Sequence, residues 1–324
     1  MKRSHLVVAL AAVVATSLLV PLAGTAAGPA DVTCPQDTMQ FTGTAHDLTV
    51  PAGGFCQITG ATITHDLIQE ANAGADILNA SVGHDVVFQD EAGAGFTNSS
   101  VAHDVVAAGF GSGADFSRST IGHDFLGLGE ASGTDLSNTT VGHDVRLLGA
   151  GGGAHMELTK IGHDFFASSP ESIQSGRNGP SSPGGTVVVG HDFTIVGSPD
   201  SDFVFDGLCN LNVGRDVAIT DRTVNLGIGL GSICAGNGEP ANTVGRDLIL
   251  TNDHAVSGFF GPSSINVGAN HVGRDLVFTG NTAAPGGKLN VSGNVIGRDA
   301  TCTGNDPAVT VDTPNVAARS NTCG

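Results

Sequence analysis

The amino-acid sequence predicts an all-β chain wound as a parallel β-helix (β-solenoid) of about twelve coils, each 19–31 residues long. Three observations lead to this prediction. A five-residue phrase of the type Val-Gly-His-Asp-Val recurs along most of the chain. The residues around it are mainly Val, Ile, Phe and Leu, which favour β-strands. The 48 glycines among 324 residues disfavour helices.

The repeat is counted most simply by the charged pair at its centre. His-Asp begins at residues 46, 65, 84, 103, 123, 143, 163 and 191, and Arg-Asp begins at 215, 246, 274 and 298. The first spacings are 19 or 20 residues, and the later ones range from 24 to 31. A repeat of this length is too short for a pair of helices and suits one coil of short strands.

Two apolar segments joined by small-residue bends are expected in each coil. The first surrounds the phrase, as Val82, Val86 and Phe88 do, and the second is a piece such as residues 76–78. Stacked coils lie about 4.8 Å apart, so equivalent apolar residues would form one internal core. Residues 168–185, rich in Ser, Pro and Gly, are predicted to be a loop insertion that bulges from the rod.

Residues 1–27 are predicted to be a signal peptide. Lys2 and Arg3 precede an apolar run from Leu6 to Leu22, and small residues up to Ala27 offer a cleavage site. A retained membrane anchor is the alternative, and no later segment is apolar enough to span a bilayer. We therefore expect an extracellular or cell-wall protein in which residues 28–324 form a single solenoid domain.

The six cysteines support this arrangement, because an exported chain can form disulfides. Fifteen pairings are possible. Sequential pairing joins residues 22, 25 and 21 positions apart, each about one coil, and gives the bridges Cys34–Cys56, Cys209–Cys234 and Cys302–Cys323. We expect the first and last pairs to lie in an N-terminal cap region at 31–60 and a C-terminal cap region at 300–324, where a solenoid must protect its open edges.

The charge balance excludes several partners. The formal net charge is −18, and removal of the predicted signal peptide leaves 31 acidic residues against 11 basic ones. Such a chain is expected to bind neither nucleic acid nor anionic lipid, and we expect no membrane association after signal cleavage. A cation or a polymer of the cell wall or surface remains compatible with this charge. The absence of Trp and Tyr disfavours sugar sites built on aromatic stacking.

In a solenoid the repeated aspartates form a row of like charges about 4.8 Å apart, which needs an explanation. In our preferred interpretation the phrase is a turn: Gly takes unusual backbone angles, Asp accepts N–H bonds within its own coil, and His or Arg points outward as counter-charge. The alternative is a calcium-binding row formed by Asp66, Asp85, Asp104, Asp124, Asp144 and Asp164. A transition-metal site on the stacked histidines is a third interpretation, disfavoured because Arg replaces His in four coils.

The calcium alternative draws on three short pieces outside the phrase. GADIL (74–78), GADFS (113–117) and GTDLS (133–137) resemble half of a calcium-binding nonapeptide repeat, but the strict nonapeptide never occurs in tandem. We therefore assign no metal site and no cofactor.

The exchange of His for Arg accompanies a change in charge along the chain. Residues 28–190 carry 18 acidic and 4 basic residues, whereas residues 191–324 carry 13 and 7. We expect the carboxylates to raise the pKa of the histidines above its ordinary value, while the arginines are permanently charged.

Catalytic motifs are missing or weak. The sequence contains no HExxH, GxSxG or Walker A phrase, and GAGGGA at 149–154 fits only a loose GxGxxA with no helix expected after it. Asp200, Asp202 and Asp206 form the only dense acidic group outside the repeat, and we expect them on a surface loop near a bulge. No catalytic or cofactor-binding residue is assigned.

The chain resembles exported repeat proteins of actinobacteria, which carry a signal peptide, an early Cys pair, repeated VGGN-L-V phrases and a Cys-bounded C-terminal tail. The matching pieces are residues 33–56, the GHD and GRD phrases, and residues 301–323, which together span nearly all of the exported chain. The sequence departs from the pattern by using His-Asp or Arg-Asp where Gly-Asn is usual. The resemblance implies a secreted, right-handed parallel β-helix whose role is mostly unassigned; polymerising, cytoplasmic bactofilin-like solenoids are a more distant analogy.

These observations predict a secreted or cell-wall-associated structural or adhesive protein without enzymatic activity. One alternative is a β-helix enzyme that acts on polysaccharide, which would need carboxylates or arginines clustered outside the repeat along a groove. The other is a calcium-stabilised extracellular repeat protein.

Overall fold

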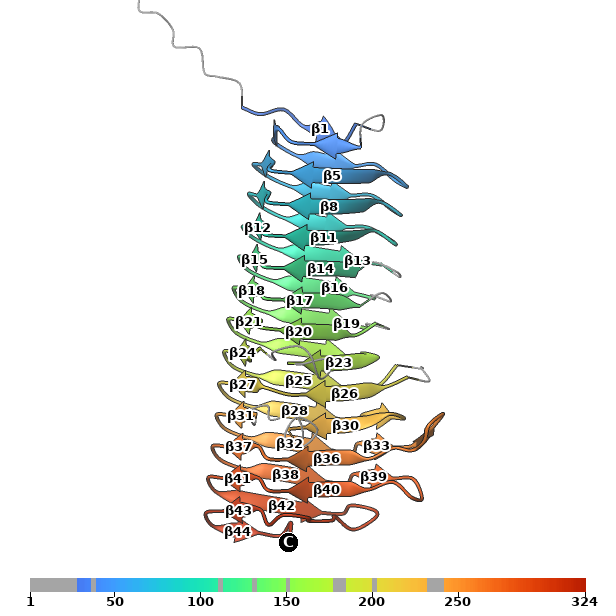
Figure 1. Cartoon of the computed structure of the whole chain (residues 1–324), viewed down its shortest axis with the longest axis vertical. Helices are drawn as coiled ribbons and strands as arrows, with labels where there is room; N and C mark the ends of the chain where they lie inside the picture. The colour runs from blue at the N-terminus through green and yellow to red at the C-terminus, as the bar shows by residue number, and fades with distance from the viewer. Residues whose placement is uncertain are drawn as a thin grey trace, which may run out of the picture.

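A computed structural model describes residues 28–35, 39–109, 113–129, 133–149, 152–176, 185–199, 203–231 and 242–324. These residues form strands and turns, and they contain no helix long and apolar enough to cross a membrane. The strands stack into a parallel β-solenoid of about 13 turns (Figure 1), which confirms the predicted fold class with one coil more than expected. The predicted signal peptide, residues 1–27, lies outside the described residues.

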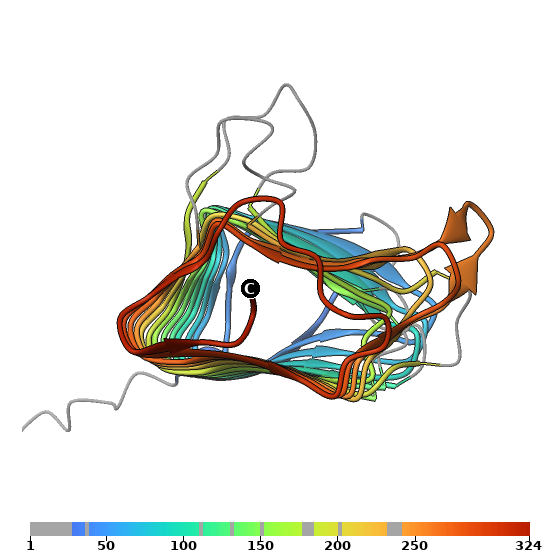
Figure 2. The same cartoon turned by 90° about the horizontal axis from the view of Figure 1, so that it is seen from below.

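Three long sheets form the sides of the rod, whose cross-section is roughly triangular (Figure 2). A regular coil passes through the third sheet, then the first, then the second, as β9, β10 and β11 do at Ser81–Val82, Val86–Phe88 and Gly93–Thr97. The sequence predicted two strands in each coil rather than three. The strand that was not predicted is that of the third sheet, which has two residues in most coils. So short a strand shows no alternation of apolar and polar residues.

The first sheet has 14 strands, most of which begin directly after the charged pair. They are β1 Val32–Thr33, β4 Leu48–Val50, β7 Leu67–Gln69, β10 Val86–Phe88, β13 Val105–Ala108, β16 Phe125–Leu128, β19 Val145–Leu148, β22 Phe165–Ser168, β25 Phe193–Val196, β28 Val217–Thr220, β32 Leu248–Thr251, β38 Leu276–Thr279, β42 Asp299–Thr303 and β44 Ser320–Asn321.

The second sheet has 12 strands. They are β2 Gln40–Phe41, β5 Phe55–Thr59, β8 Gly74–Leu78, β11 Gly93–Thr97, β14 Gly113–Ser117, β17 Thr134–Ser137, β20 Ala154–Glu157, β23 Ser172–Ser175, β26 Phe205–Leu208, β30 Gly227–Leu230, β36 Ile265–Gly268 and β40 Leu289–Ser292.

The third sheet has 13 strands, and two small sheets accompany it. The strands of the third sheet are β3 Thr44–Ala45, β6 Thr62–Ile63, β9 Ser81–Val82, β12 Ser100–Val101, β15 Thr120–Ile121, β18 Thr140–Val141, β21 Lys160–Ile161, β24 Val187–Val189, β27 Leu211–Val213, β31 Thr243–Val244, β37 His271–Val272, β41 Val295–Ile296 and β43 Val316–Ala317. The small sheets are β29 Thr223–Val224, β33 His254–Ala255 and β39 Thr282–Ala283, and the hairpin β34 Ser257–Gly258 with β35 Gly261–Pro262.

Inward side chains stack coil upon coil into one core. Val145, Phe165 and Phe193 open successive strands of the first sheet, pair in register and are fully buried. The rings of Phe165 and Phe193 stack with centroids 4.5 Å apart. Full burial of one such side chain contributes about 1.5–3 kcal/mol, so repetition along the rod supplies the main stabilisation.

Buried polar residues at the corner between the second and third sheets also stack from coil to coil. In the first half they are hydroxyls: the N–H of Ser99 donates to Oγ of Ser119 over 3.2 Å. In the second half they are amides: Asn270 donates to Oδ1 of Asn294 from its N–H over 3.1 Å and from Nδ2 over 2.9 Å. These ladders satisfy backbone groups that the corner removes from the sheets.

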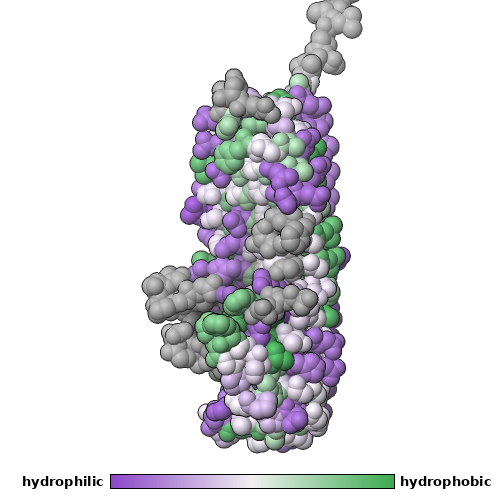
Figure 3. All heavy atoms as spheres, turned by 90° about the vertical axis from the view of Figure 1, so that its right-hand side faces the viewer, coloured by the Kyte–Doolittle hydropathy of each residue, from purple (hydrophilic) through white to green (hydrophobic). Residues whose placement is uncertain are grey.

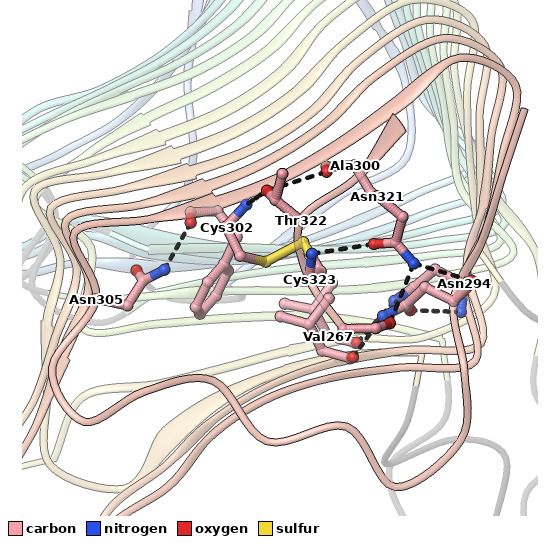
Figure 4. The surroundings of a disulfide bond; sticks show 12 residues. Val267, Asn294, Ala300, Cys302, Asn305, Asn321, Thr322 and Cys323 are labelled. Carbon is pink, nitrogen blue, oxygen red and sulfur yellow. Dashed lines mark hydrogen bonds between the residues drawn. A yellow bond between two sulfur atoms is a disulfide. The ribbon is translucent and has the colours of Figure 1, made fainter. Parts of the chain in front are cut away.

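Disulfides join neighbouring coils at both ends of the rod. Cys34–Cys56 and Cys302–Cys323 are formed, with Cα atoms 6.2 and 4.9 Å apart, as the sequence predicted. Figure 4 shows the second bridge, beside which Cys323 donates its N–H to Oδ1 of Asn321 over 3.0 Å. Cys209 is also disulfide-bonded, whereas Cys234 lies outside the described residues.

The two predicted cap regions extend the sheets. Residues 31–60 contain β1 to β5, and residues 300–324 contain β43, β44 and most of β42. The chain end turns inward across the lower opening of the rod (Figure 2). Cys323 is buried and belongs to the core.

The predicted loop insertion at 168–185 is wrong for its first part. Ser168 ends β22, and residues 172–175 form β23 of the second sheet, with Ile173 fully buried. The Ser and Pro content suggested a loop. However, Ile173 pairs in register with Ala154 of the previous coil and so joins the same buried row. Residues 177–184 lie outside the described residues.

A buried ion pair links three coils in the middle of the rod. The Arg222 guanidinium donates to both oxygens of Asp206 over 2.9 and 3.0 Å, and to the carbonyls of Pro170 and Gly197 over 2.8 and 2.6 Å. The expectation of a surface loop is therefore wrong for Asp206, which lies fully buried in β26 because Arg222 supplies its counter-charge. Asp200 and Asp202 lie outside the described residues.

Asp253 lies beside this pair and is the one acid in a ladder of amides. Its Oδ1 accepts the N–H of Arg222 over 2.9 Å, while its buried Oδ2 has no hydrogen-bond partner among the described residues. Burial raises the pKa of Asp253 to about 8. The equivalent position is occupied by Asn281 and Asn305 in the next two coils. Each of these amides donates Nδ2 to a carbonyl of the preceding coil.

We predict that Asp253→Asn stabilises the protein above pH 8. The folded pKa of Asp253 exceeds its unfolded value of about 4, so the native state binds more protons and the free energy of unfolding falls between about pH 4 and pH 8, by an amount on the order of a few kcal/mol. An Asn side chain has no carboxyl group to ionise, so this loss of stability does not occur in the variant. We expect its Nδ2 to donate to the carbonyl of Ile219, because Ile219 pairs with Leu250, whose carbonyl accepts Nδ2 of Asn281.

Denaturant unfolding of both proteins at pH 5 and pH 8.5 tests this expectation. Asn281→Asp is the matched control, because it places an acid in the same ladder and should add the same pH dependence. An Asp253→Asn protein that is less stable at pH 8.5, or that keeps the wild-type pH slope, contradicts the assignment.

Candidate functional site

The repeated phrase forms the corner at which each coil passes from the third sheet to the first. After β9, Gly83 and His84 form the bend, and Asp85 precedes β10. The N–H of each His or Arg donates to the carbonyl of the equivalent residue in the preceding coil, over 2.7–3.2 Å from His65 to Arg298. The corner therefore has the same backbone geometry in coil after coil.

The glycine of the phrase allows neighbouring coils to lie close together. Its φ angle is not positive in any of the phrases, so the expectation of unusual backbone angles is wrong. A Cβ at Gly142 or Gly162 would lie 2.0 Å from the carbonyl oxygen of the preceding coil. Thr64 and Ala102 occupy this place in two of the early coils.

Each aspartate of the row binds the next coil. Its Oδ1 accepts the N–H of the following Asp over 2.9–3.2 Å, and Asp299 accepts that of Ser320 over 3.1 Å. The expectation that Asp accepts N–H bonds within its own coil is wrong for the backbone, because the N–H that each Oδ1 accepts belongs to the next coil. Asp144 also accepts a side-chain hydrogen bond within its own coil, from Nη2 of Arg146 over 2.6 Å. The complete row is Asp47, Asp66, Asp85, Asp104, Asp124, Asp144, Asp164, Asp192, Asp216, Asp247, Asp275 and Asp299.

In the first half, histidines supply a second donor to the same carboxylates. From His65 to His163, Nδ1 lies 2.8–3.0 Å from Oδ1 of the Asp in the preceding coil. A carboxylate only accepts hydrogen bonds, so Nδ1 carries the proton. The seven rings from His46 to His163 stack with centroids 4.8–5.2 Å apart and planes within 9° of parallel, whereas His191 is tilted by 54°.

The histidine row is accessible from outside. The side chains from His46 to His163 are 36–48% exposed. Since Nδ1 is bound to Asp, Nε2 is the ring atom left for an external partner. It accepts a hydrogen bond when the ring is neutral and donates one when the ring is protonated.

In the second half, arginines take over the role of the histidines. Nε of Arg246, Arg274 and Arg298 donates to Oδ1 of the preceding Asp over 2.7 Å, and Nη2 donates to Oδ2 of the same carboxylate. Arg215, at the junction, lies farther from its partner, with Nε 3.6 Å from Oδ1 of Asp192. The exchange of His for Arg thus replaces a titratable hydrogen-bond donor with a permanently charged, bidentate donor.

These bonds remove the repulsion that a row of carboxylates would otherwise suffer. The N–H of Asp66 and the ring of His65 hold the pKa of Asp47 below its usual value, and the Arg298 guanidinium does the same for Asp275. In return, the hydrogen bond that His103 donates to Asp85 raises the pKa of His103. The interpretation of His and Arg as outward counter-charges agrees with this geometry.

The hydrogen bonds along the row disfavour the calcium alternative. Calcium needs a cage of free oxygen ligands, but each Oδ1 from Asp66 to Asp164 already faces a backbone N–H, and most also face an imidazole N–H. Trios such as His84, Asp85 and His103 bring ligand atoms within 4.8 Å of one another. However, Nδ1 and Oδ1 of such a trio already share a proton, and neighbouring parallel rings are too widely spaced for one tetrahedral metal ion.

A smaller polar cluster lies outside the repeat, on the second sheet. Asp135 binds Nδ1 of His155 over 2.9 Å and also accepts a hydrogen bond from Ser137, beside an open depression of about 260 Å³ that Asp115 also lines. Burial and the neighbouring Asp135 raise the pKa of Asp115, and the bond to Asp135 raises that of His155. This cluster was not predicted from the sequence, although His155 falls in register with Asp135 at the coil spacing.

No protein-family model, curated protein or solved structure matches this chain. The fold and the end disulfides agree with the resemblance to exported repeat proteins, and the family assignment stays a prediction.

We predict that His103 titrates above the ordinary value of about 6.5 and that Asp85→Asn lowers its pKa. The physical reason is the 2.8 Å hydrogen bond between Nδ1 of His103 and Oδ1 of Asp85. A pH titration of the ring signals by NMR measures the pKa. His143 is the internal control, because its pKa is raised by Asp124 and should not change in the variant. An unchanged His103 pKa in Asp85→Asn would show that the pair is not electrostatic.

Proposed function

We propose that the chain is an extracellular structural protein that lies along a linear, hydroxyl-rich polymer of the cell wall or surface and does not act as an enzyme. The disulfide-closed β-solenoid is compatible with an extracellular structural protein. The observation that carries the proposal is a pair of polar rows that accompany each other along the first half of the rod.

The second row consists of hydroxyls on the third sheet. In the third sheet, each strand from β3 to β18 begins with a Ser or Thr that points outward, and the next residue is buried. These strands pair in register. The row is Thr44, Thr62, Ser81, Ser100, Thr120 and Thr140. In the coils from Thr62 to Thr140, one buried residue and one Gly, Ala or Thr separate the hydroxyl from the exposed histidine, and in the first coil Ala45 alone separates Thr44 from His46.

This surface suits a polymer that runs parallel to the rod. Hydroxyls and imidazole Nε2 both donate and accept hydrogen bonds, which matches the hydroxyls of a glycan. The groups repeat at the coil spacing of 4.8–5.2 Å, so one chain can meet the same donors in successive coils. Weak single contacts then add up through multivalency, without the aromatic platforms that the sequence lacks.

Nothing in the described surface favours catalysis over binding. The carboxylates of the row are engaged by the next coil, and two cavities, of about 510 and 360 Å³, lie at the end caps beside Cys302 and Cys34. The Asp135 and His155 cluster is open and shallow, on a different sheet from the two rows.

Sedimentation with purified peptidoglycan and with cellulose tests the proposal. Thr62→Val, Thr120→Val and Thr140→Val together remove three hydroxyls and keep the β-branched shape. Because each hydrogen bond contributes about 0.5–1.5 kcal/mol, we expect the affinity of the triple variant to fall at least about tenfold. Thr49→Val, Thr59→Val and Thr97→Val, on the other two sheets, form the matched control and should bind as the wild type does.

Three results would contradict the proposal. They are failure of the wild-type protein to sediment with either polymer, equal losses in the two triple variants, and release of soluble sugars from the polymer. The last result would instead support an enzyme and would direct attention to Asp135 and His155.

A further inference from the structure

One hairpin breaks the regularity of the solenoid. Between β33 and β36 the chain forms β34 and β35, the only antiparallel pair among the described strands. The hairpin (orange) lies outside the outline shared by the stacked coils in Figure 2. It is therefore an addition to the coil, and the core does not require it.

The tip of the hairpin presents two phenylalanines to solvent. Phe259 and Phe260 are 87% and 80% exposed, and their rings meet edge to face with centroids 5.3 Å apart. By contrast, Phe165 and Phe193 are fully buried, as is usual for this residue. Two adjacent exposed rings indicate an interaction surface.

The base of the hairpin is held firmly. Ser263 Oγ lies 2.9 and 2.7 Å from the carbonyl oxygens of Val224 and Val256, which share its one proton, and the N–H of Val256 donates to the carbonyl of Val224 over 2.8 Å. The tip is thus presented by the rigid rod in a fixed place. Figure 3 shows apolar surface on this side of the rod, over the lower coils.

The shape and chemistry of the tip select its partner. Residues 255–264 carry no charge, while the whole chain carries −18, so an anionic surface is repelled and a neutral one is not. Two rings can bury far less accessible surface than the roughly 800 Å² that each partner buries in a stable protein interface. Rings set edge to face at 85° cannot both lie flat on one sugar. A convex tip also does not fit another convex tip on a second copy.

We propose that Phe259 and Phe260 insert into the surface of an uncharged or zwitterionic lipid layer and attach the side of the rod to it. A lipid surface needs no complementary shape and buries a small apolar tip fully. Two phenyl rings give a weak, reversible attachment, comparable to other single apolar anchors. The expectation of no membrane association rested on the negative charge and on the lack of a later spanning segment, and neither excludes a shallow attachment to neutral lipid.

Vesicle flotation tests the proposal with the full exported chain. We expect the wild-type protein to float with phosphatidylcholine vesicles and to bind less well when phosphatidylglycerol is included. Phe259→Ser with Phe260→Ser should reduce binding to phosphatidylcholine by about tenfold or more. Phe259→Leu with Phe260→Leu should keep most of it, because an aliphatic tip still inserts into lipid. An unchanged melting temperature shows that each variant is folded.

The control variant is Leu158→Ser, which removes another exposed apolar side chain, 53% exposed and far from the hairpin. It should bind as the wild type does. The proposal is overturned if the wild type does not float, if the serine variant floats equally well, or if Leu158→Ser loses binding to the same extent. Self-association that depends on Phe259 and Phe260 would instead assign the tip to a second copy and overturn the lipid assignment.

Discussion

The structure depends on one repeated interaction: a carboxylate in each coil that accepts hydrogen bonds from the next. Asp85 shows the pattern, with the N–H of Asp104 and the ring of His103 both directed at its Oδ1. Without these donors, a row of carboxylates at the coil spacing would oppose stacking. With them, the row specifies the register, because a slip of one residue would move every donor away from its acceptor.

The same coil-to-coil arrangement recurs inside the rod and at its ends. Asn270 and Asn294 stack as amides, Phe165 and Phe193 stack as rings, and Cys302 joins Cys323 across one coil spacing. Each of these is one residue type repeated at the interval of the coil. The hairpin tip departs from this repeat, so it is a place where a function separate from stacking can be sought beside the repeated rows.

The sequence predicted those parts that the repeat itself encodes. Equal spacing of the Asp residues implied stacked coils, and one-coil separations implied the terminal Cys pairs. The partner of each Asp could not be predicted, because local turn chemistry describes one coil while the observed bond joins two. The pair of Arg222 and Asp206 was missed because its two residues lie outside the repeat. Phe259 and Phe260 were missed because periodicity says nothing about an insertion.

Amide hydrogen exchange, resolved by coil at pH 5.5 and pH 8 and corrected for intrinsic rates, tests whether the pairs of His and Asp hold neighbouring coils together. The Asp253→Asn protein is the right sample, because the buried acid then adds no pH dependence of its own. Raised histidine pKa values contribute stability that is present below pH 6.5 and lost as the pH rises through the folded pKa. We expect residues 46–163 to lose protection at pH 8 and residues 246–298 to keep it. Equal changes in both halves, or tighter histidine coils at pH 8, would contradict it.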